Sequence, residues 1–303
     1  MATSPAPDGS DFTVRFWGVR GTVPTPGPET VRYGGNTACI EVRCGGERLV
    51  FDVGTGARIL GKCVEDEGPC DAHIFLTHTH LDHVAGFPFF RPAYCPTNRF
   101  HLWAGHLRRQ GLTLEGTLAD LMCKPLFPVP LDVMQAAREF HDFEAGEPIH
   151  LATGLTIRTA PLNHPGGATG YRVDYGGRAF ALVTDTEHVP GAPDGHVLGL
   201  IEGCDVVVYD ATYTDASFPH FKGWGHSTWQ EGVRLCEAAG ARRLIAFHHD
   251  PDSDDDALAA IDGALAARRP GSGVAREGAV LTGETFEIAL QQHTFGGQAI
   301  EVG

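Results

Sequence analysis

The stretch LTHTHLDH at residues 76–83 places three histidines and one aspartate within six positions. It follows the apolar run AHIFL, so it stands where a buried strand would end. Alternate side chains of an extended chain share a face, so His78 and His80 can hold one ion together. Asp82 and His83 follow, where the chain must turn, and could reach a second ion nearby. Imidazole combined with carboxylate suits zinc, iron or manganese, whereas an all-oxygen set would suggest magnesium or calcium.

Three further metal-capable residues stand at the ends of apolar runs elsewhere in the chain. They are His164 after LTIRTAPLN, Asp185 after RAFALVT and His248 after RRLIAF. A lone histidine or aspartate at such a position is usually a turn residue. In the presence of LTHTHLDH, however, they predict that several strand ends converge at one edge of a sheet sandwich. The expected arrangement is a dinuclear site with room for water.

Short strand-like runs, punctuated by glycine and proline, fill both halves of the chain. In the first half they occupy residues 12–18, 38–44, 48–54, 72–77 and 99–105, with a helix candidate at 57–65. In the second half strands are expected at 155–162, 170–175, 178–185, 205–211 and 242–248, and helices at 196–204, 227–240 and 253–267. Ser227 and Ser253 open the last two helices and are the expected N-caps.

The mixed elements show no 20–50-residue repeat and no clean linker. They predict a single domain over residues 12–303, with two β-rich halves and helices outside. Residues 1–11 are expected to form a flexible N-terminal tail, and residues 284–303 a C-terminal extension that the pattern does not place. The aromatic and proline-rich stretch 84–135 is expected either to line the pocket or to pack a protomer interface.

Composition limits the partners. The 303-residue chain has 42% hydrophobic residues, which fits a folded globular protein, and a formal net charge of −15. Its 23 lysines and arginines are dispersed, which disfavours a long nucleic acid partner. A small anionic substrate stays compatible, because metal ions supply local positive charge.

Cysteine usage and the chain start bear on location. The eight cysteines form no CxxC pair and indicate reduced thiols, with a structural zinc site as the alternative. The N-terminus lacks the basic and apolar segments of a secretory signal. No run approaches the roughly 20 apolar residues of a membrane span. A cytoplasmic protein without membrane association is therefore predicted.

In the metal-capable residues described above, the sequence resembles the metallo-β-lactamase superfamily. The HxHxDH motif at 78–83 carries the resemblance, and YGGNTACIEV (33–42) and LVFDVGTG (49–56) resemble the opening hairpin of that family. The resemblance runs from about residue 12 to about residue 252. It implies an α/β fold, an αββα four-layer sandwich of metallo-β-lactamase type, and a metal-dependent hydrolase.

The resemblance also implies a set of metal ligands and two divalent metal ions, with zinc favoured and manganese or iron as alternatives. The first ion would be held by His78, His80 and His164, the second by Asp82, His83 and His248, and Asp185 would bridge the two. His249 is the alternative to His248. His248 is preferred because the strand of such family members ends at the first histidine, with proline three residues later, here Pro251.

Residues 205–228, DVVVYDATYTDASFPHFKGWGHST, are similar to the phosphodiesterase branch of that superfamily. This branch includes the tRNA 3′-end endonuclease tRNase Z and the phosphoribosyl cyclic phosphate phosphodiesterase. It carries an acidic-Ala-Thr motif, here beginning at Asp210, and a His-Ser-Thr motif, here beginning at His226. The catalytic residues implied are Asp82, Asp210 and His226.

The expected chemistry explains why the phosphodiesterase branch carries these two motifs. Two metal ions about 3.5–4 Å apart can activate a bridging hydroxide that attacks phosphorus. The departing alkoxide is a poor leaving group, so His226 would donate a proton to it as general acid. Asp210 would keep that imidazole charged and oriented.

The size of the substrate follows from the spacing. The tRNA endonuclease carries a long basic arm between its third histidine and its bridging aspartate, whereas residues 165–184 here are typical of a short hairpin. A small, cyclic phosphodiester is therefore expected, such as a cyclic nucleotide or phosphoribosyl 1,2-cyclic phosphate. Candidate substrate contacts are Tyr213, Lys222 and Trp224. A lid that packs on itself, or the face of a homodimer, is the alternative for this loop.

Two other function classes stay open. A lactonase or a thioesterase could use the same metal site, although its chemistry has less need of Asp210 and His226. A non-catalytic binding protein of the same fold tends to lose ligands, whereas all seven are present here.

Overall fold

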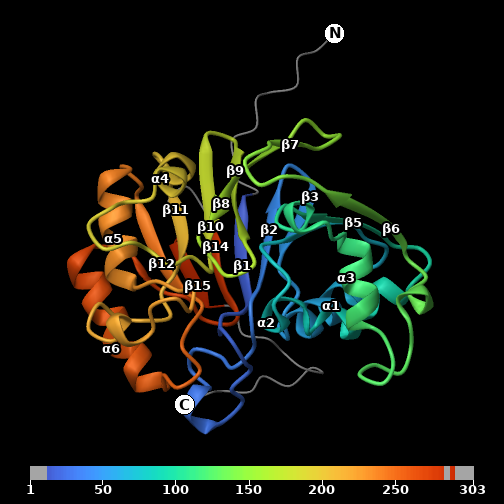
Figure 1. The fold of residues 1–303 in the computed structure, drawn as a ribbon, viewed down its shortest axis with the longest axis horizontal. Coiled ribbons are helices and arrows are strands. Elements are labelled where there is room, and N and C mark those ends of the chain that lie inside the picture. The colour runs from blue at the N-terminus through green and yellow to red at the C-terminus, as the bar shows by residue number, and fades with distance from the viewer. Residues whose placement is uncertain (1–11, 283–286, 291–303) are drawn as a thin grey trace.

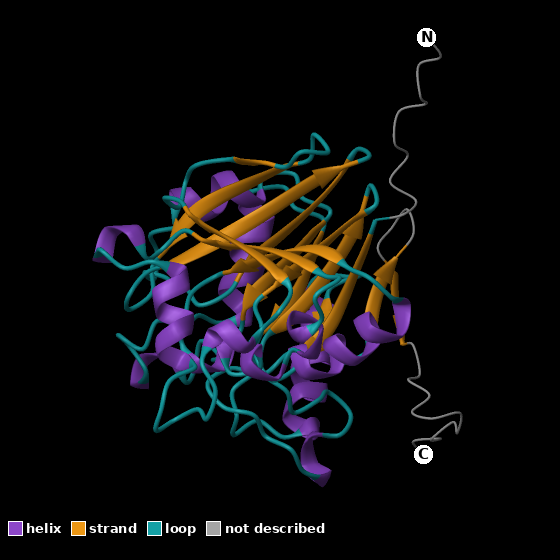
Figure 2. Cartoon of the chain, turned by 90° about the vertical axis from the view of Figure 1, so that its right-hand side faces the viewer, coloured by secondary structure: helices purple, strands orange, loops and turns teal. Residues whose placement is uncertain are grey.

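The computed structural model describes residues 12–282 and 287–290. Two twisted β-sheets pack face to face, and helices cover the outer face of each sheet (Figures 1 and 2). The αββα four-layer sandwich expected from the sequence is therefore confirmed. The predicted tail at 1–11, and residues 284–286 and 291–303 of the predicted C-terminal extension, lie outside the described residues.

The first sheet runs in the order β15-β14-β1-β2-β3-β4-β5-β6. Its strands are β1 (Thr13–Gly18), β2 (Cys39–Cys44), β3 (Glu47–Phe51), β4 (Asp71–Leu76), β5 (Arg99–Ala104), β6 (Ala137–Asp142), β14 (Ala279–Thr282) and β15 (Glu287–Leu290). Strands β3 to β6 are parallel to one another. Strand β15 pairs antiparallel with β14, so this part of the C-terminal extension adds an edge strand.

The second sheet runs in the order β13-β12-β11-β10-β9-β8-β7. Its strands are β7 (Ile149–His150), β8 (Thr156–Leu162), β9 (Ala168–Tyr175), β10 (Arg178–Val183), β11 (Val206–Asp210), β12 (Arg243–Phe247) and β13 (Gly273–Val274). Strands β10 to β13 are parallel, whereas β8, β9 and β10 form an antiparallel meander. Each sheet thus contains one block of parallel strands.

Six α-helices complete the described layers. They are α1 (Ala57–Glu67), α2 (Leu81–Val84), α3 (Leu114–Leu121), α4 (Gly195–Ile201), α5 (Trp229–Ala238) and α6 (Asp255–Arg268). Short 3-10 helices lie at Pro28–Thr30, Phe87–Phe89, Arg91–Tyr94, Arg108–Gln110, Leu131–Val133 and Phe218–His220. Helices α1 and α3 lie against the eight-stranded sheet, and α4, α5 and α6 against the other (Figure 1). No helix in the described ranges is both long and apolar enough to cross a bilayer.

The period-2 alternation of strand side chains divides the core into three apolar clusters. In β4, Phe75 faces the cluster between the sheets, whereas Ile74 and Leu76 face the cluster under α1 and α3. A third cluster lies between the seven-stranded sheet and α4, α5 and α6. Both sheets are therefore covered on both faces at their centres, which explains why a central parallel strand such as β11 is a nearly continuous, buried apolar run, whereas the edge strand β6 is not.

The aromatic stretch after the histidine motif belongs to this packing. Phe87 and Phe90 are buried in the apolar cluster on the outer face of the eight-stranded sheet. A methyl group added to Gly61 of α1 would lie only 3.2 Å from the Phe90 ring and 3.0 Å from Pro92, so this segment packs closely on α1. The start of 84–135 therefore forms part of the core.

Two helix starts differ by one residue from the sequence prediction. Thr228 rather than Ser227 caps α5, and Asp254 rather than Ser253 caps α6. The Asp254 carboxylate accepts a hydrogen bond from the backbone N–H of Ala257 at 2.7 Å. Serine, threonine and aspartate are all good N-caps, so the order of neighbouring candidates is decided by where the first turn begins.

Removing the observed cap of α6 should destabilise the fold, whereas removing the neighbouring hydroxyl should not. Asp254→Ala should lower the free energy of unfolding by about 1 kcal/mol, because an N–H of the first turn loses its partner. The matched control Ser253→Ala should stay within about 0.5 kcal/mol of the parent. Urea unfolding followed by circular dichroism measures both values. A larger loss in Ser253→Ala would place the cap one residue earlier.

Candidate metal and catalytic site

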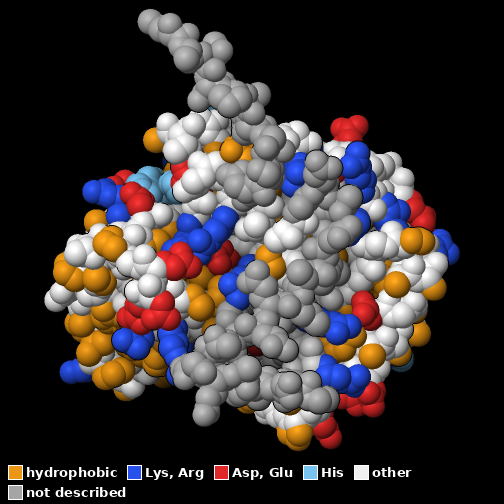
Figure 3. All heavy atoms as spheres, turned by 180° about the vertical axis from the view of Figure 1, so that it is seen from behind, with side chains coloured by type: hydrophobic (Ala, Val, Ile, Leu, Met, Phe, Trp, Pro, Cys, Tyr) orange, Lys and Arg blue, Asp and Glu red, His pale blue; other side chains and the backbone are white. Residues whose placement is uncertain are grey.

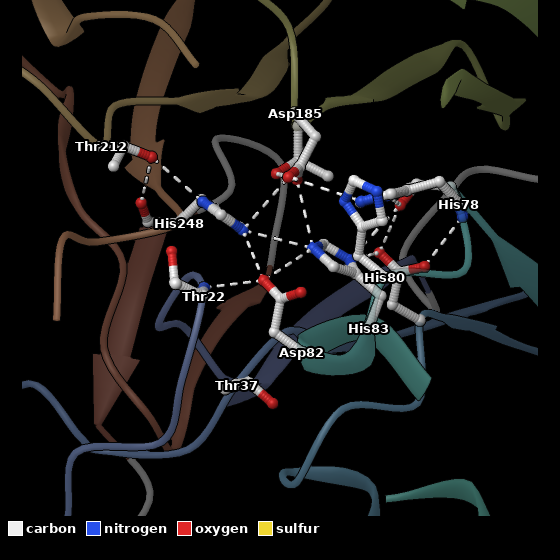
Figure 4. Close-up of polar contacts among 12 residues, drawn as sticks. Thr22, Thr37, His78, His80, Asp82, His83, Asp185, Thr212 and His248 are labelled. Atoms are coloured by element: carbon white, nitrogen blue, oxygen red, sulfur yellow. Dashed lines mark hydrogen bonds and ion pairs between the residues drawn. The ribbon is translucent and has the colours of Figure 1, made fainter. Parts of the chain in front are cut away.

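The chemistry-bearing residues follow the carboxyl ends of parallel strands in both sheets. The motif at 78–83 follows β4, Asp185 follows β10, Asp210 ends β11 and His248 follows β12. Ligand sites of α/β sheets form beyond such strand ends, where side chains leave the sheet together. Figure 4 shows several of these side chains pointing toward one another from different strands.

The structure brings all seven candidate ligands together in two adjoining groups. Within each group, one nitrogen or oxygen atom per residue lies within 4.8 Å of the others. The first group is His78, His80 and His164, and the second is Asp82, His83, Asp185 and His248. All are buried except His80, so the cluster opens to solvent on the side of His80.

Asp185 lies between the two groups. Its Oδ1 is 3.7 Å from His78 Nε2 and 3.4 Å from His248 Nε2. Its Oδ2 is 3.3 Å from His83 Nε2. A carboxylate with oxygens near both groups is suited to bridging two cations.

Hydrogen bonds outside the cluster orient the imidazoles. His164 Nδ1–H donates to the carbonyl of Gly225 at 2.8 Å, and His83 Nδ1 contacts Asp52 Oδ2 at 2.8 Å. His248 Nδ1 contacts the Thr212 hydroxyl at 3.0 Å. With the Nδ1 protons held by these outer partners, the Nε2 lone pairs face inward, as metal-binding histidines require.

The inward nitrogens fit bound cations. His83 Nε2 and His248 Nε2 are 3.2 Å apart, and His164 Nε2 is 3.1 Å from His80 Nδ1. His78 Nε2 is buried without a hydrogen-bond partner among the described residues. Lone pairs brought this close repel unless a proton or a cation lies between them. The residues present therefore match the divalent ions that the fold implies.

The charges of the buried side chains also favour bound cations. Burial alone would lower the pKa of His83, but Asp185, Asp82 and Asp52 outweigh it and raise that pKa well above its usual range. Burial alone would raise the pKa of Asp185, but His248, His83 and His78 hold it well below its usual range. Both shifts show that the buried carboxylates require positive charge beside them, which metal ions would supply.

The backbone at the site is held in an unusual conformation. The described residues contain four non-glycine positions with positive φ, namely Thr22, Asp52, Asp185 and His248. Asp185 and His248 are candidate ligands and Asp52 holds His83, while the backbone N–H of Thr22 donates to Asp82 Oδ2 at 2.7 Å. A non-glycine residue held in this conformation lowers the stability of the fold by about 1–3 kcal/mol, and residues strained in this way are concentrated at functional sites.

Two glycines allow the backbone to approach the ligands. A methyl group added to Gly21 would lie 2.2 Å from His248 Cε1. A methyl group added to Gly225 would lie 2.3 Å from His164 Nδ1, and Gly225 has φ of 86°. Any larger residue at these positions would displace a ligand ring.

His226 and Asp210 lie beside the ligand cluster. His226 Nδ1 is 3.0 Å from Asp210 Oδ2, and the His226 ring is 4.9 Å from the His248 ring. Burial alone would lower the pKa of His226, but the neighbouring carboxylates, Asp210 foremost, raise it to about 9. These carboxylates therefore favour the protonated imidazole, the form in which a histidine can act as an acid.

The three candidate substrate contacts are placed differently. Tyr213 is buried and stacks on Phe221 at 4.3 Å, and its ring is 6.0 Å from the His226 ring. Lys222 is exposed, and the Trp224 side chain is 63% exposed. The loop that carries them is fixed by Glu187, which accepts from the backbone N–H of residues 223 and 225.

The structure refines the predicted set of site residues at two positions. His249 points out of the cluster, and its Nε2 donates to the carbonyl of Ala275 at 2.9 Å, so His248 is the histidine that faces the other candidate ligands. Asp52, which holds His83, was missed as a site residue. It stands directly after the apolar run of β3, the same signal that identified the other strand-end residues.

Asp52→Asn should weaken metal binding, because the amide no longer carries the charge that orients His83. We expect a loss of about 10–100-fold in metal affinity, the usual effect of removing such an outer partner. Zinc content after dialysis against a chelator series measures it. Asp66→Asn, an exposed aspartate on α1, is the matched control and should bind metal like the parent. Parent-like affinity in Asp52→Asn would show that Asp52 does not support the ligands.

Comparisons with known proteins find relatives of similar sequence and similar fold. The chain is 26% identical over 283 residues to ribonuclease Z of Haloarcula marismortui, covering 78% of this chain and 85% of that protein. The fold is similar to the metallo-β-lactamase fold protein YhfI from Bacillus subtilis, with a TM-score of 0.66, 17% identity, and coverage of 90% of this chain and 100% of that one. It is also similar to a diphosphatase from the PhnP family, with a TM-score of 0.65, 19% identity, and coverage of 92% and 100%.

The family itself is given by a domain model. The beta-lactamase superfamily domain matches residues 48–249, more than half of the chain, and this range contains all seven candidate ligands as well as Asp210 and His226. The chain belongs to the beta-lactamase superfamily and is a metal-dependent hydrolase related to ribonuclease Z.

Proposed function

We propose that this chain is a phosphodiesterase that hydrolyses a small, anionic and cyclic phosphodiester. The observation that carries the proposal is the buried His226–Asp210 pair beside the ligand cluster. The relatives named ribonuclease Z support a phosphodiester as the bond cleaved. Hydrolysis of a lactone or a thioester expels a better leaving group and has less need of such a pair.

His226 would protonate the alkoxide that leaves phosphorus. Because Asp210 holds Nδ1–H, Nε2 is the nitrogen left for the substrate. Asp210 is itself fixed, since its Oδ1 accepts from the Thr212 hydroxyl at 2.9 Å and its Oδ2 from the backbone N–H of Thr186 at 3.2 Å. A general acid positioned in this way contributes about 10²–10⁴-fold to the rate.

The seven clustered residues would hold two divalent cations, with zinc favoured and manganese or iron as alternatives. When bound, such ions polarise a phosphoryl oxygen and generate a hydroxide nucleophile near neutral pH. His78, His80 and His164 would hold one ion, Asp82, His83 and His248 the other, and Asp185 would contact both. The exposed position of His80 supports a substrate that binds on its side of the cluster.

The substrate is proposed to be small because the chain offers little to a polynucleotide. Between His164 and Asp185 it forms only β9, a tight turn and β10, where the resemblance to the tRNA endonuclease would place an arm. The net charge of −15 repels a phosphate backbone. On the face seen in Figure 3, basic side chains are scattered among acidic and apolar ones.

The loop before His226 is proposed to bind the rest of the substrate. Trp224 and Lys222 offer an exposed ring and a positive charge, and Tyr213 supports the loop from beneath. An aromatic face beside a cation suits a nucleobase or sugar attached to phosphate. We also propose a cytoplasmic location, since none of the eight cysteines, all within the described residues, forms a disulfide. That the chain forms a homodimer remains a prediction from the sequence.

A substrate panel tests the proposed reaction. The zinc- and manganese-loaded protein would be assayed with 3′,5′- and 2′,3′-cyclic nucleotides, phosphoribosyl 1,2-cyclic phosphate, bis-p-nitrophenyl phosphate, a lactone and a thioester. We expect one cyclic phosphodiester to turn over faster than the nitrophenyl ester. His80→Ala, with an unchanged circular dichroism spectrum, should lose that turnover. Hydrolysis of the lactone or thioester alone would replace the proposal with the alternative function.

The role of His226 is tested by the leaving group. His226→Ala should slow a cyclic or alkyl phosphodiester by about 10²–10⁴-fold, because an alkoxide needs the proton. The nitrophenyl ester should be slowed much less, since nitrophenolate leaves without one. His220→Ala, an exposed histidine of the same loop, is the control and should keep parent rates on both. Equal losses on both substrates in His226→Ala would count against a general acid.

A further inference from the structure

A second group of histidines lies on the eight-stranded sheet and shares no residue with the catalytic cluster. His73 of β4 pairs in register with His101 of β5, and His101 pairs with Glu139 of β6. His141 stands two residues beyond Glu139, so both point to the same face of β6. These strands lie on the side of the sheet away from β1 and β14, and β6 is its edge strand (Figure 1).

Three of these residues have the spacing of a metal site. His101, Glu139 and His141 each offer one ligand atom, and these atoms lie within 4.8 Å of one another. His101 Nδ1 is 3.3 Å from Glu139 Oε2. Tetrahedral zinc with bonds of about 2.0–2.1 Å separates its ligand atoms by about 3.3 Å, so small side-chain movements suffice to close the site.

The surroundings orient each of the three. The opposite nitrogen of His101, Nε2, lies 3.5 Å from Asp71 Oδ1, the usual kind of partner behind a metal-bound imidazole. Glu139 directs Oε1 to Arg99 Nη1 at 2.6 Å and leaves Oε2 toward His101. The Trp103 ring stacks on His141 at 3.9 Å and fixes its plane.

An ion pair alone does not explain this group. The contacts of His101 with Asp71 and Glu139 would account for those three side chains. His141 Nε2, however, is buried and has no hydrogen-bond partner among the described residues. A buried polar atom left unpaired costs about 1–3 kcal/mol. A cation bound beside it would satisfy that nitrogen.

We propose that His101, Glu139 and His141 bind one divalent transition-metal ion, separate from the catalytic centre. Two imidazoles and one carboxylate suit zinc, and also cobalt, nickel or copper. The ion would join β5 to β6. Strand β6 is the edge strand and pairs only with β5 in the described sheet. Binding to the folded state would then stabilise that edge. The proposal does not depend on the proposed reaction.

Metal content tests the site. Tag-free, full-length parent, Glu139→Gln and His141→Gln proteins would be dialysed to equilibrium against the same buffered zinc solution, and zinc per chain would be measured by mass spectrometry. We expect each variant to bind one equivalent less than the parent. The thermal midpoint should rise with zinc more in the parent than in the variants, while activity with bis-p-nitrophenyl phosphate stays at the parent level.

The control is His150→Ala, an exposed histidine on β7 outside every candidate cluster, which should bind as much zinc as the parent. The side chain of Glu139 is 45% exposed, so Glu139→Gln should fold even if His141→Gln does not. Equal zinc content in the parent and Glu139→Gln would overturn the proposal. The same equivalent lost in His150→Ala would also overturn it, because surface histidines in general would then account for the binding.

Discussion

The constraint on which this structure depends is the crowding of imidazole nitrogens and carboxylates in one buried space. His83 Nε2 and His248 Nε2 face each other at 3.2 Å, with Asp82 and Asp185 against them. Such a group is unstable without positive charge at its centre, because like lone pairs repel and buried carboxylates need a partner. The outer hydrogen bonds, the backbone strain and the close glycines all serve to keep these atoms together.

The two sheets make that crowding possible. Parallel strands from each sheet end at the same edge, so residues distant in the sequence arrive there together. The left-handed backbone of Asp52, Asp185 and His248 turns each side chain out of its strand and into the cluster. Strain of about 1–3 kcal/mol at each position is tolerable because three apolar clusters hold the strands rigidly behind it. The rigid part of the molecule thus stabilises the strained part.

In the proposed reaction, the candidate ligand cluster and the His226–Asp210 pair have separate roles. The ligands account for membership of a superfamily that supports many reactions, so they do not by themselves choose one. His226 and Asp210 form a hydrogen-bonded pair beside the candidate ligands, and in the proposed reaction this pair supplies the proton. In the proposed reaction, the choice of a phosphodiester rests on this pair, and the small size of the substrate rests on the short β9–β10 hairpin and the loop that carries Trp224.

The sequence alone predicted most of the strands, because short apolar runs broken by glycine and proline are local signals, and its resemblance to the metallo-β-lactamase superfamily predicted the sandwich. It also identified the seven candidate ligands, since HxHxDH and residues after apolar strands are local signals. Only the tertiary structure decided which of His248 and His249 faces the cluster, since a backbone twist separates neighbours that look alike in sequence. It alone paired Asp52 with His83 and joined His101, Glu139 and His141, because contacts between distant strands depend on register, which no single run of residues contains.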